Sequence, residues 1–162
     1  MSPDKILRAV FLACLWLLAT GSACEPQDQP GGELTEILIS LQGKNPGADG
    51  RYTLQVDERA RILALGRYLS GREEEIALAL FWQLSPPGPA ELICESDELT
   101  GDRLMVIGRQ PGQQEIRGVT RNEADTVIPC SPAPDGGWSF PDAGNDWPLW
   151  SHPMQIEIRG GE

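Results

Sequence analysis

Short stretches of alternating apolar and polar residues recur along this chain and constrain its fold more than any other feature. In the first stretch, Ile37, Ile39 and Leu41 alternate with neighbours such as Glu36 and Ser40. This two-residue period is that of a β-strand with one buried face. Turn residues separate the stretches at roughly ten-residue intervals, which is typical of a β-sandwich. The predicted strands are 37–41, 52–56, 60–65, 76–84, 90–94, 103–108, 114–120, 125–129 and 154–159.

The segment from residue 70 to residue 89 is the least clear part of this pattern. Residues 70–72 and the acidic run 73–75 predict a turn. Residues 76–84 (IALALFWQL) are almost continuously apolar, which fits either a buried strand or a helix. Their short length and the Pro/Gly run at 86–89 favour a strand. No stretch predicts an amphipathic helix, so we expect an all-β sandwich of about seven to nine short strands.

Composition narrows the range of partners. The chain has 18 Gly and 14 Pro among 162 residues, which favours turn-rich β structure. Its formal net charge is −11. Nucleic acids and anionic membrane surfaces are therefore excluded as expected partners, because binding phosphate requires clustered cations.

The N-terminal segment has the three-part layout of a secretory signal peptide. Lys5 and Arg8 precede an apolar run at residues 9–19, and small residues at 20–23 lead to Cys24. An apolar run of this length extends only ~16 Å as a helix, about half of the hydrocarbon core of a bilayer. We therefore predict that residues 1–23 direct export and are then removed.

The sequence LATGSAC at residues 18–24 resembles the lipobox of bacterial lipoproteins. The resemblance implies that Cys24 is acylated and attaches the mature chain to a membrane. The alternative is ordinary signal peptidase cleavage after Ala23, because Gly21 and Ala23 are both small enough for that enzyme. The expected location is the cell envelope, either periplasmic or at the cell surface, or the medium if Cys24 carries no lipid.

Two further cysteines remain after the predicted signal and Cys24. Cys94 and Cys130 are predicted to form one disulfide, since an exported chain meets an oxidising compartment. Neither lies in a C-x-x-C motif, and His152 is the only histidine of the sequence, which argues against zinc or redox chemistry.

We expect four segments. Residues 1–23 form the signal peptide, and residues 24–34 a Pro/Gly-rich tether. Residues 35–130 form the sandwich, and residues 131–162 a Trp/Pro/Gly-rich tail that ends in a strand.

Residues 54–119 resemble the bacterial Ig-like (immunoglobulin-like) group 2 domains. The matching positions are Ala60, Ile62, Ala64, Gly66, Tyr68, Ser70, Gly71, Ile76, Trp82, Ser85, Ala90, Leu92, Gly108, Gly112 and Ile116. The resemblance implies an Ig-like β-sandwich in which Trp82 fills the gap between two sheets ~10 Å apart. It also implies a role in adhesion, glycan contact or spacing.

The sequence offers few candidate site residues. No nucleophile, metalloprotease or P-loop motif occurs, so neither an enzyme nor a cofactor is expected. Trp138, Trp147 and Trp150 form either a stacking platform for a sugar or protein partner, or a packed cover over one sheet edge. Two acidic groups are candidate calcium ligands or solvated turn residues: Asp142, Asn145 and Asp146, and the stretch Glu95, Asp97, Glu98 and Asp102.

The sequence thus predicts an exported, lipid-anchored, non-enzymatic Ig-like module for cell-surface or envelope binding and adhesion. Its expected partners are the membrane, through the lipid, and an envelope protein or glycan. The alternative is an accessory structural subunit that docks on an envelope protein complex through a strand edge or the Trp-rich tail.

Overall fold

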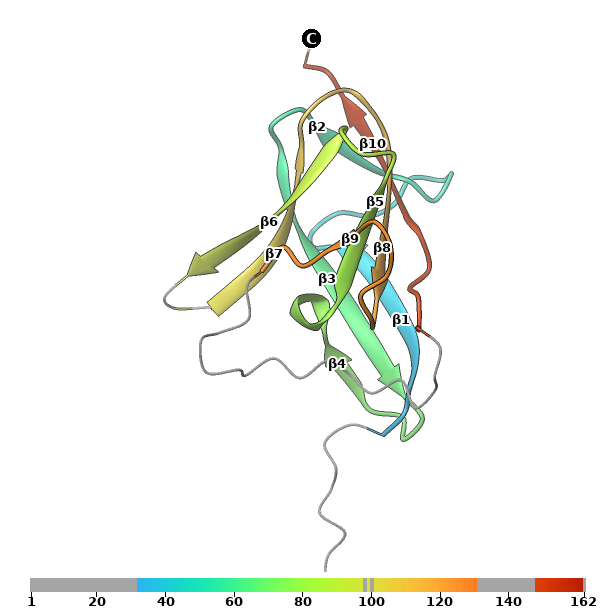
Figure 1. Ribbon diagram of the computed structural model, residues 1–162. Coiled ribbons are helices and arrows are strands. Elements are labelled where there is room, and N and C mark those ends of the chain that lie inside the picture. Colours follow the sequence, from blue (N-terminus) through green and yellow to red (C-terminus); the bar gives the residue numbers. More distant parts are fainter. Residues whose placement is uncertain (1–31, 98, 100, 131–147, 162) are drawn as a thin grey trace, which may run out of the picture. The chain divides into compact units, whose positions relative to one another are not determined.

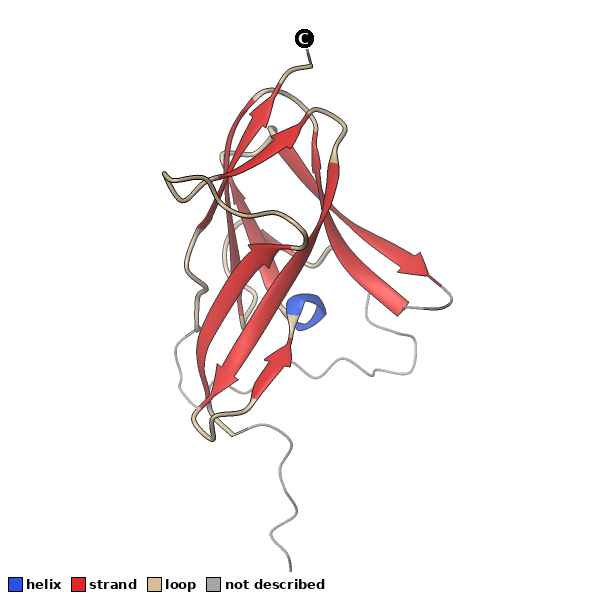
Figure 2. Ribbon diagram, turned by 180° about the vertical axis from the view of Figure 1, so that it is seen from behind, coloured by secondary structure: helices blue, strands red, loops and turns tan. Residues whose placement is uncertain are grey.

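Two β-sheets face each other across a single hydrophobic core in the computed structural model (Figure 1). The structure describes residues 32–161 except 98, 100 and 131–147. Its strands are β1 (Leu34–Leu41), β2 (Tyr52–Gln55), β3 (Arg59–Tyr68), β4 (Glu73–Glu75), β5 (Phe81–Ser85), β6 (Ala90–Asp97), β7 (Gly101–Gly108), β8 (Gly112–Val119), β9 (Thr126–Val127) and β10 (Met154–Arg159). A single 3-10 turn, η1 (Ala77–Ala79), is the helical element of the described part (Figure 2).

The first sheet has the strand order β1-β3-β7-β6, with β4 pairing to the far end of β3. The second sheet has the order β2-β10-β8-β5-β9. In chain order, β1, β3, β6 and β7 take the places of strands A, B, D and E of an immunoglobulin-like sandwich, and β5, β8 and β10 those of C, F and G. The predicted all-β sandwich is therefore confirmed, with an Ig-like strand order.

The alternation predicted from the sequence matches the buried faces. Along β3, Ala60, Ile62 and Ala64 are buried, whereas Leu63 and Leu65 point to the opposite face. The fully buried side chains come from both sheets, which is the packing of a sandwich. They include Leu54, Ile62, Trp82, Leu104, Ile116 and Ile156.

The predicted strand at residues 76–84 is wrong in its first half. Only Phe81–Ser85 forms a strand, and residues 77–79 form the turn η1. The turn buries Ile76, Ala77 and Leu80 together, which a strand with alternating faces cannot do. It also turns the Ala77 carbonyl toward Trp82, whose Nε1 donates a hydrogen bond to it at 3.0 Å. The buried indole N–H is thereby satisfied.

The acidic run at residues 73–75 forms the short strand β4, where the sequence predicted a turn. Its residues pair antiparallel with Leu65, Gly66 and Arg67 of β3. Glu73 lies 2.7 Å from Arg67 Nε, and Glu75 lies 2.7 Å from Arg61 Nη2. Three adjacent glutamates are poor strand residues by propensity, but the arginines opposite them offset their repulsion.

The last strand, β10, lies inside the second sheet between β2 and β8. It pairs antiparallel with β8 and parallel with β2. Ile156 and Ile158 are buried in the core on this strand. The sandwich thus uses residues on both sides of segment 131–147 and extends beyond the predicted boundary at residue 130.

Two residues of β8 adapt the second sheet to its surroundings. A Cβ on Gly118 would lie 2.8 Å from Leu80 Cδ1, so glycine lets η1 approach the sheet. Gln114 is fully buried, and its Oε1 accepts a hydrogen bond from the Ala90 amide at 3.1 Å. Its Nε2 donates to the Pro86 carbonyl at 2.9 Å, which fixes the loop between β5 and β6.

Candidate binding surfaces and the disulfide

The predicted disulfide between Cys94 and Cys130 is present. Cys94 lies on β6 of the first sheet, and Cys130 follows β9 of the second, with 5.0 Å between their Cα atoms. Cys130 is buried in the core cluster and Cys94 packs against it. Antibody domains instead join strands B and F, so this bond anchors a different strand, β6, to the opposite sheet.

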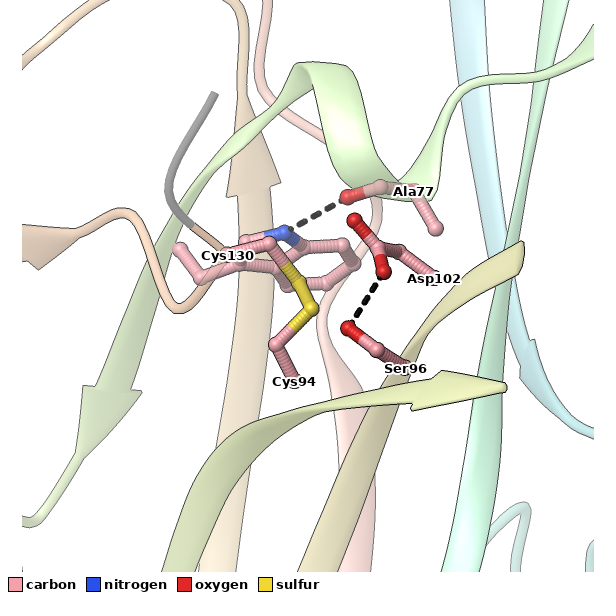
Figure 3. The surroundings of a disulfide bond; sticks show 6 residues. Ala77, Cys94, Ser96, Asp102 and Cys130 are labelled. Carbon is pink, nitrogen blue, oxygen red and sulfur yellow. Dashed lines mark hydrogen bonds between the residues drawn. A yellow bond between two sulfur atoms is a disulfide. The ribbon is translucent and has the colours of Figure 1, made fainter. Parts of the chain in front are cut away.

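The hairpin of β6 and β7 projects away from β3 (Figure 1), and its strands continue past Cys94. Its strands pair without interruption from Ala90 and Gly108 to Asp97 and Gly101. Near its end, Ser96 Oγ donates a hydrogen bond to Asp102 Oδ1, and both lie beside the Cys94–Cys130 bond (Figure 3).

The outer edge of β6 presents main-chain groups. The Pro89 carbonyl accepts a hydrogen bond from the Arg109 amide, so this carbonyl faces β7. The next residue, Ala90, points its amide the opposite way, toward Gln114. Because antiparallel pairing alternates, the N–H and C=O groups of Leu92, Cys94 and Ser96 also point away from β7. No other described strand pairs with this edge.

Of the predicted tryptophan platform, the structure describes only Trp150. Trp138 and Trp147 lie outside the described residues. Trp150 is half-buried and forms a single β-bridge with Val119, which in turn pairs with Phe81. Bridged residues share a sheet face, so Phe81, Val119 and Trp150 form one row on the outer side of the second sheet, in which the central Val119 is buried. Phe81 was not anticipated, although its alternation with buried Trp82 indicates its outward direction.

The rest of the second sheet's outer face is polar. Glu115 accepts hydrogen bonds from Arg117 Nε and Gln155 Nε2, each at 2.6 Å. Gln83, Gln113 and Glu157 occupy neighbouring outward positions. The aromatic row therefore borders a surface of amide and carboxylate groups.

The candidate calcium ligands are not brought together within the described residues. Asp142, Asn145 and Asp146 lie outside that part of the chain. Glu95 faces Arg59 at 2.7 Å, and Asp102 accepts from Ser96. His152 is exposed, with its Nε2 3.8 Å from Glu36 Oε1. Residues 32–161, as far as they are described, contain no group of three or more His, Cys, Asp or Glu placed to hold a metal ion.

An ion pair between Lys44 and Glu58 connects the segments that precede and follow β2. Lys44 Nζ lies 2.6 Å from Glu58 Oε1 and donates to the Thr53 carbonyl at 3.1 Å. Glu58 Oε2 accepts a hydrogen bond from the Gln55 amide at 2.7 Å. The hydrogen bond from Lys44, followed by that from Gln55, lowers the pKa of Glu58.

The lowered pKa of Glu58 makes the free energy of unfolding depend on pH. A carboxyl whose pKa is lower in the folded state stabilises the fold above its unfolded pKa, and this contribution is lost as pH falls through the folded value. We expect Glu58→Gln to lower the free energy of unfolding by about 0.5–1 kcal/mol at pH 7, since the pair is partly exposed. Urea denaturation should show the difference shrinking toward about pH 3, below the ordinary range for glutamate. Glu157→Gln on β10 serves as the control. If Glu58→Gln lowers the free energy of unfolding equally at pH 7 and at about pH 3, the role assigned to Glu58 is wrong.

No model of a known protein family matches the chain, and no curated protein matches its sequence. In the described part of the chain, no helix has the length and hydropathy needed to cross a membrane. Cys24, the predicted acylation site, lies outside the described residues. The geometry thus defines the class of the protein, a disulfide-linked Ig-like β-sandwich.

Proposed function

We propose that this protein is an exported, lipid-anchored module of the bacterial cell envelope that binds envelope components and catalyses no reaction. The observation that carries the proposal is the Cys94–Cys130 disulfide within an Ig-like sandwich. Disulfides persist in oxidising compartments, which an exported chain reaches. The signal-like segment at residues 1–23 supplies the route.

Relationship to the Ig-like group 2 domains belongs to the same proposal. Two of the positions that resemble that family have special roles here. Trp82 is fully buried on β5, the place of strand C. A Cβ on Gly66 would lie 2.7 Å from Ile76 Cδ1, so glycine permits the close packing of β3 against the segment before η1.

Attachment through Cys24 would keep the sandwich at a membrane surface. A single acyl chain binds only marginally, whereas two or more anchor stably. The segment between Cys24 and the start of β1 at Leu34 is short and contains several Pro and Gly residues. This composition is typical of a linker that separates a domain from its anchor.

The proposed ligand-binding surface consists of the half-buried Phe81 and Trp150, which lie on either side of the buried Val119, with the polar groups beside them. Aromatic rings stack on apolar faces of sugars, and amide and carboxylate groups bond hydroxyls. Glu115, Arg117 and Gln155 lie on the same sheet face and already hydrogen-bond one another. A glycan of the cell wall fits this chemistry.

The second candidate is an accessory subunit that docks through a strand edge. The outer edge of β6 favours it, because its main-chain groups at Leu92, Cys94 and Ser96 match those of an added strand. Natural sheets usually protect such edges with proline, lysine or a bulge. The eight residues of β6 include none of these.

Export and anchoring are tested by expressing the full chain in bacteria with an alkyne-labelled fatty acid. We expect label on the protein, recovery with membranes, and an intact mass that starts at an acylated Cys24. Cys24→Ala should lose the label, while the matched control Cys14→Ser should keep it, since Cys14 lies within the apolar run. An unlabelled protein with an unmodified Cys24 would remove the anchor, and a cytoplasmic protein with reduced cysteines would overturn export.

The two binding modes are separated by retention experiments. Retention on peptidoglycan resin that is lost in Trp150→Ala supports the glycan-binding module. One stoichiometric protein partner that is lost in Ser96→Pro supports the accessory subunit. Ser96→Pro removes an N–H that points outward and leaves the hydrogen bonds between β6 and β7 intact. Ile93→Pro is the control, because it removes a hydrogen bond to β7 and shows the effect of destabilisation alone.

A further inference from the structure

The outer face of the first sheet carries five large apolar side chains, in two groups with Arg61 between them. In the pairing of β1 with β3, Leu38 lies opposite Leu65, and Leu63 follows on the same face. In the pairing of β6 with β7, Ile93 lies opposite Met105, which in turn pairs with Arg61 of β3. All five are half-buried and face away from the core. We call Leu38, Leu63, Leu65, Ile93 and Met105 the apolar band.

The apolar band differs from most of the outer face of the second sheet. There the outward positions Gln83, Gln113, Glu115, Arg117 and Gln155 are polar, and the apolar residues are confined to the row of Phe81, Val119 and Trp150. A sheet that meets water on one face normally has such polar residues there. Apolar residues grouped on a solvated face are a common feature of interaction sites.

Ion pairs enclose the apolar band and lie within the same face. Arg67 lies 2.7 Å from Glu73 and 3.0 Å from Glu36, and the hydrogen bonds that it donates to these two carboxylates raise its pKa. Arg61 pairs with Glu75, and Arg59 with Glu95, each at 2.7 Å. Covering this face keeps each of these charges beside its partner, so the cost of covering them is the desolvation of paired ions and not of isolated ones.

The charge of the face favours a partner with little net charge at the contact. At the outward strand positions whose side chains the structure describes, the face has four arginines, Arg59, Arg61, Arg67 and Arg103, and five glutamates, Glu36, Glu73, Glu75, Glu91 and Glu95. Its net charge is thus −1, whereas that of the whole chain is −11. Two copies that met elsewhere would bring their excess negative charge together, but at this face they would not. A basic partner would find more attraction on the acidic remainder of the surface.

We propose that a second copy of this chain covers the apolar band, forming a two-fold dimer through the outer faces of the first sheets. In such an interface each copy contributes the same residues, so leucines meet leucines, and the alternating arginines and glutamates face groups of opposite sign. Outer faces packed in this way lie ~10 Å apart, as sheets do within a sandwich. The dimer does not rest on the proposed envelope role, which a monomer or a dimer can fill.

The dimer is tested in cells with two differently tagged copies of the full chain. Leu38 in one copy is replaced by the photoreactive benzoylphenylalanine, and the cells are irradiated. We expect an adduct that contains both tags. Leu65→Glu, which places an unpaired charge in the interface, should reduce the adduct at least about 30-fold. The matched control Gln113→Glu, on the outer face of the second sheet, should leave it unchanged.

The folding of each variant is checked by the mobility of the Cys94–Cys130 disulfide on non-reducing gels. If Leu65→Glu lowers this signal, Met105→Glu replaces it, because Met105 lies on the other side of Arg61. Absence of the two-tag adduct would overturn the proposal. So would an adduct formed only with another protein, or one that neither glutamate substitution weakens while the disulfide persists.

Discussion

Replacement of Trp82 with alanine is expected to destabilise the protein by about 3–5 kcal/mol, a large part of the stability of a typical domain. The side chain is fully buried on β5 between the two sheets. Its loss opens a cavity and leaves the Ala77 carbonyl without the bond from Nε1. Urea unfolding followed by circular dichroism measures the change.

Two further variants separate these contributions. Trp82→Phe retains much of the apolar volume but removes the hydrogen bond, so we expect a smaller loss than with alanine. Trp150→Ala is the control, because it makes the same substitution at a half-buried position. It should lower the free energy of unfolding by less than half as much as Trp82→Ala does. Equal effects at Trp82 and Trp150 would contradict the central position of Trp82 in the core.

Removal of the disulfide by the double substitution Cys94→Ala and Cys130→Ala is expected to cost about 4 kcal/mol. The cysteines are 36 residues apart, and closure of a loop of this size restricts the unfolded chain by that amount in the entropy model. The midpoint of urea unfolding should fall in the double variant. With reductant present, the midpoint of urea unfolding of the wild-type protein should fall toward that of the double variant.

The location of the bond predicts where its loss acts first. Cys94 fixes β6, an edge strand that pairs with β7 alone among the described strands. Hydrogen exchange should therefore increase in β6 more than in β3 or β8, which have neighbours on both sides. If hydrogen exchange increases equally in all strands, the disulfide stabilises the whole sandwich and has no particular effect on β6.

Much of the fold could be predicted from alternation, because one side of each strand is buried. The faces of β3 follow the sequence pattern, with Ala60 and Ile62 inside. Alternation failed where tertiary contacts decide the conformation. The turn η1 forms because Ile76, Ala77 and Leu80 all reach the core, and β4 forms because arginines of β3 face its glutamates. Neither cause is visible within a short window of sequence.

The candidate sites were less accessible to sequence reasoning. The Cys94–Cys130 pair followed from counting cysteines in a chain that is predicted to be exported, and Trp150 was identified by its residue type. Phe81 was missed because its position beside Trp150 depends on the pairing of β5 with β8 and on the bridge at Val119. The apolar band was missed for a similar reason, since Leu38 and Leu65 become neighbours only through the pairing of β1 with β3.

The position of β10 between β2 and β8 has a consequence for how the chain acquires its structure. β2 pairs in its sheet only with β10, about one hundred residues later in the sequence, among the described strands. A ribosome makes roughly 5–20 residues per second, so β2 is without its neighbour for several seconds of synthesis. During that time the second sheet is incomplete. If the chain is exported as proposed, a channel that admits only unfolded polypeptide would meet a sandwich whose second sheet cannot yet be closed.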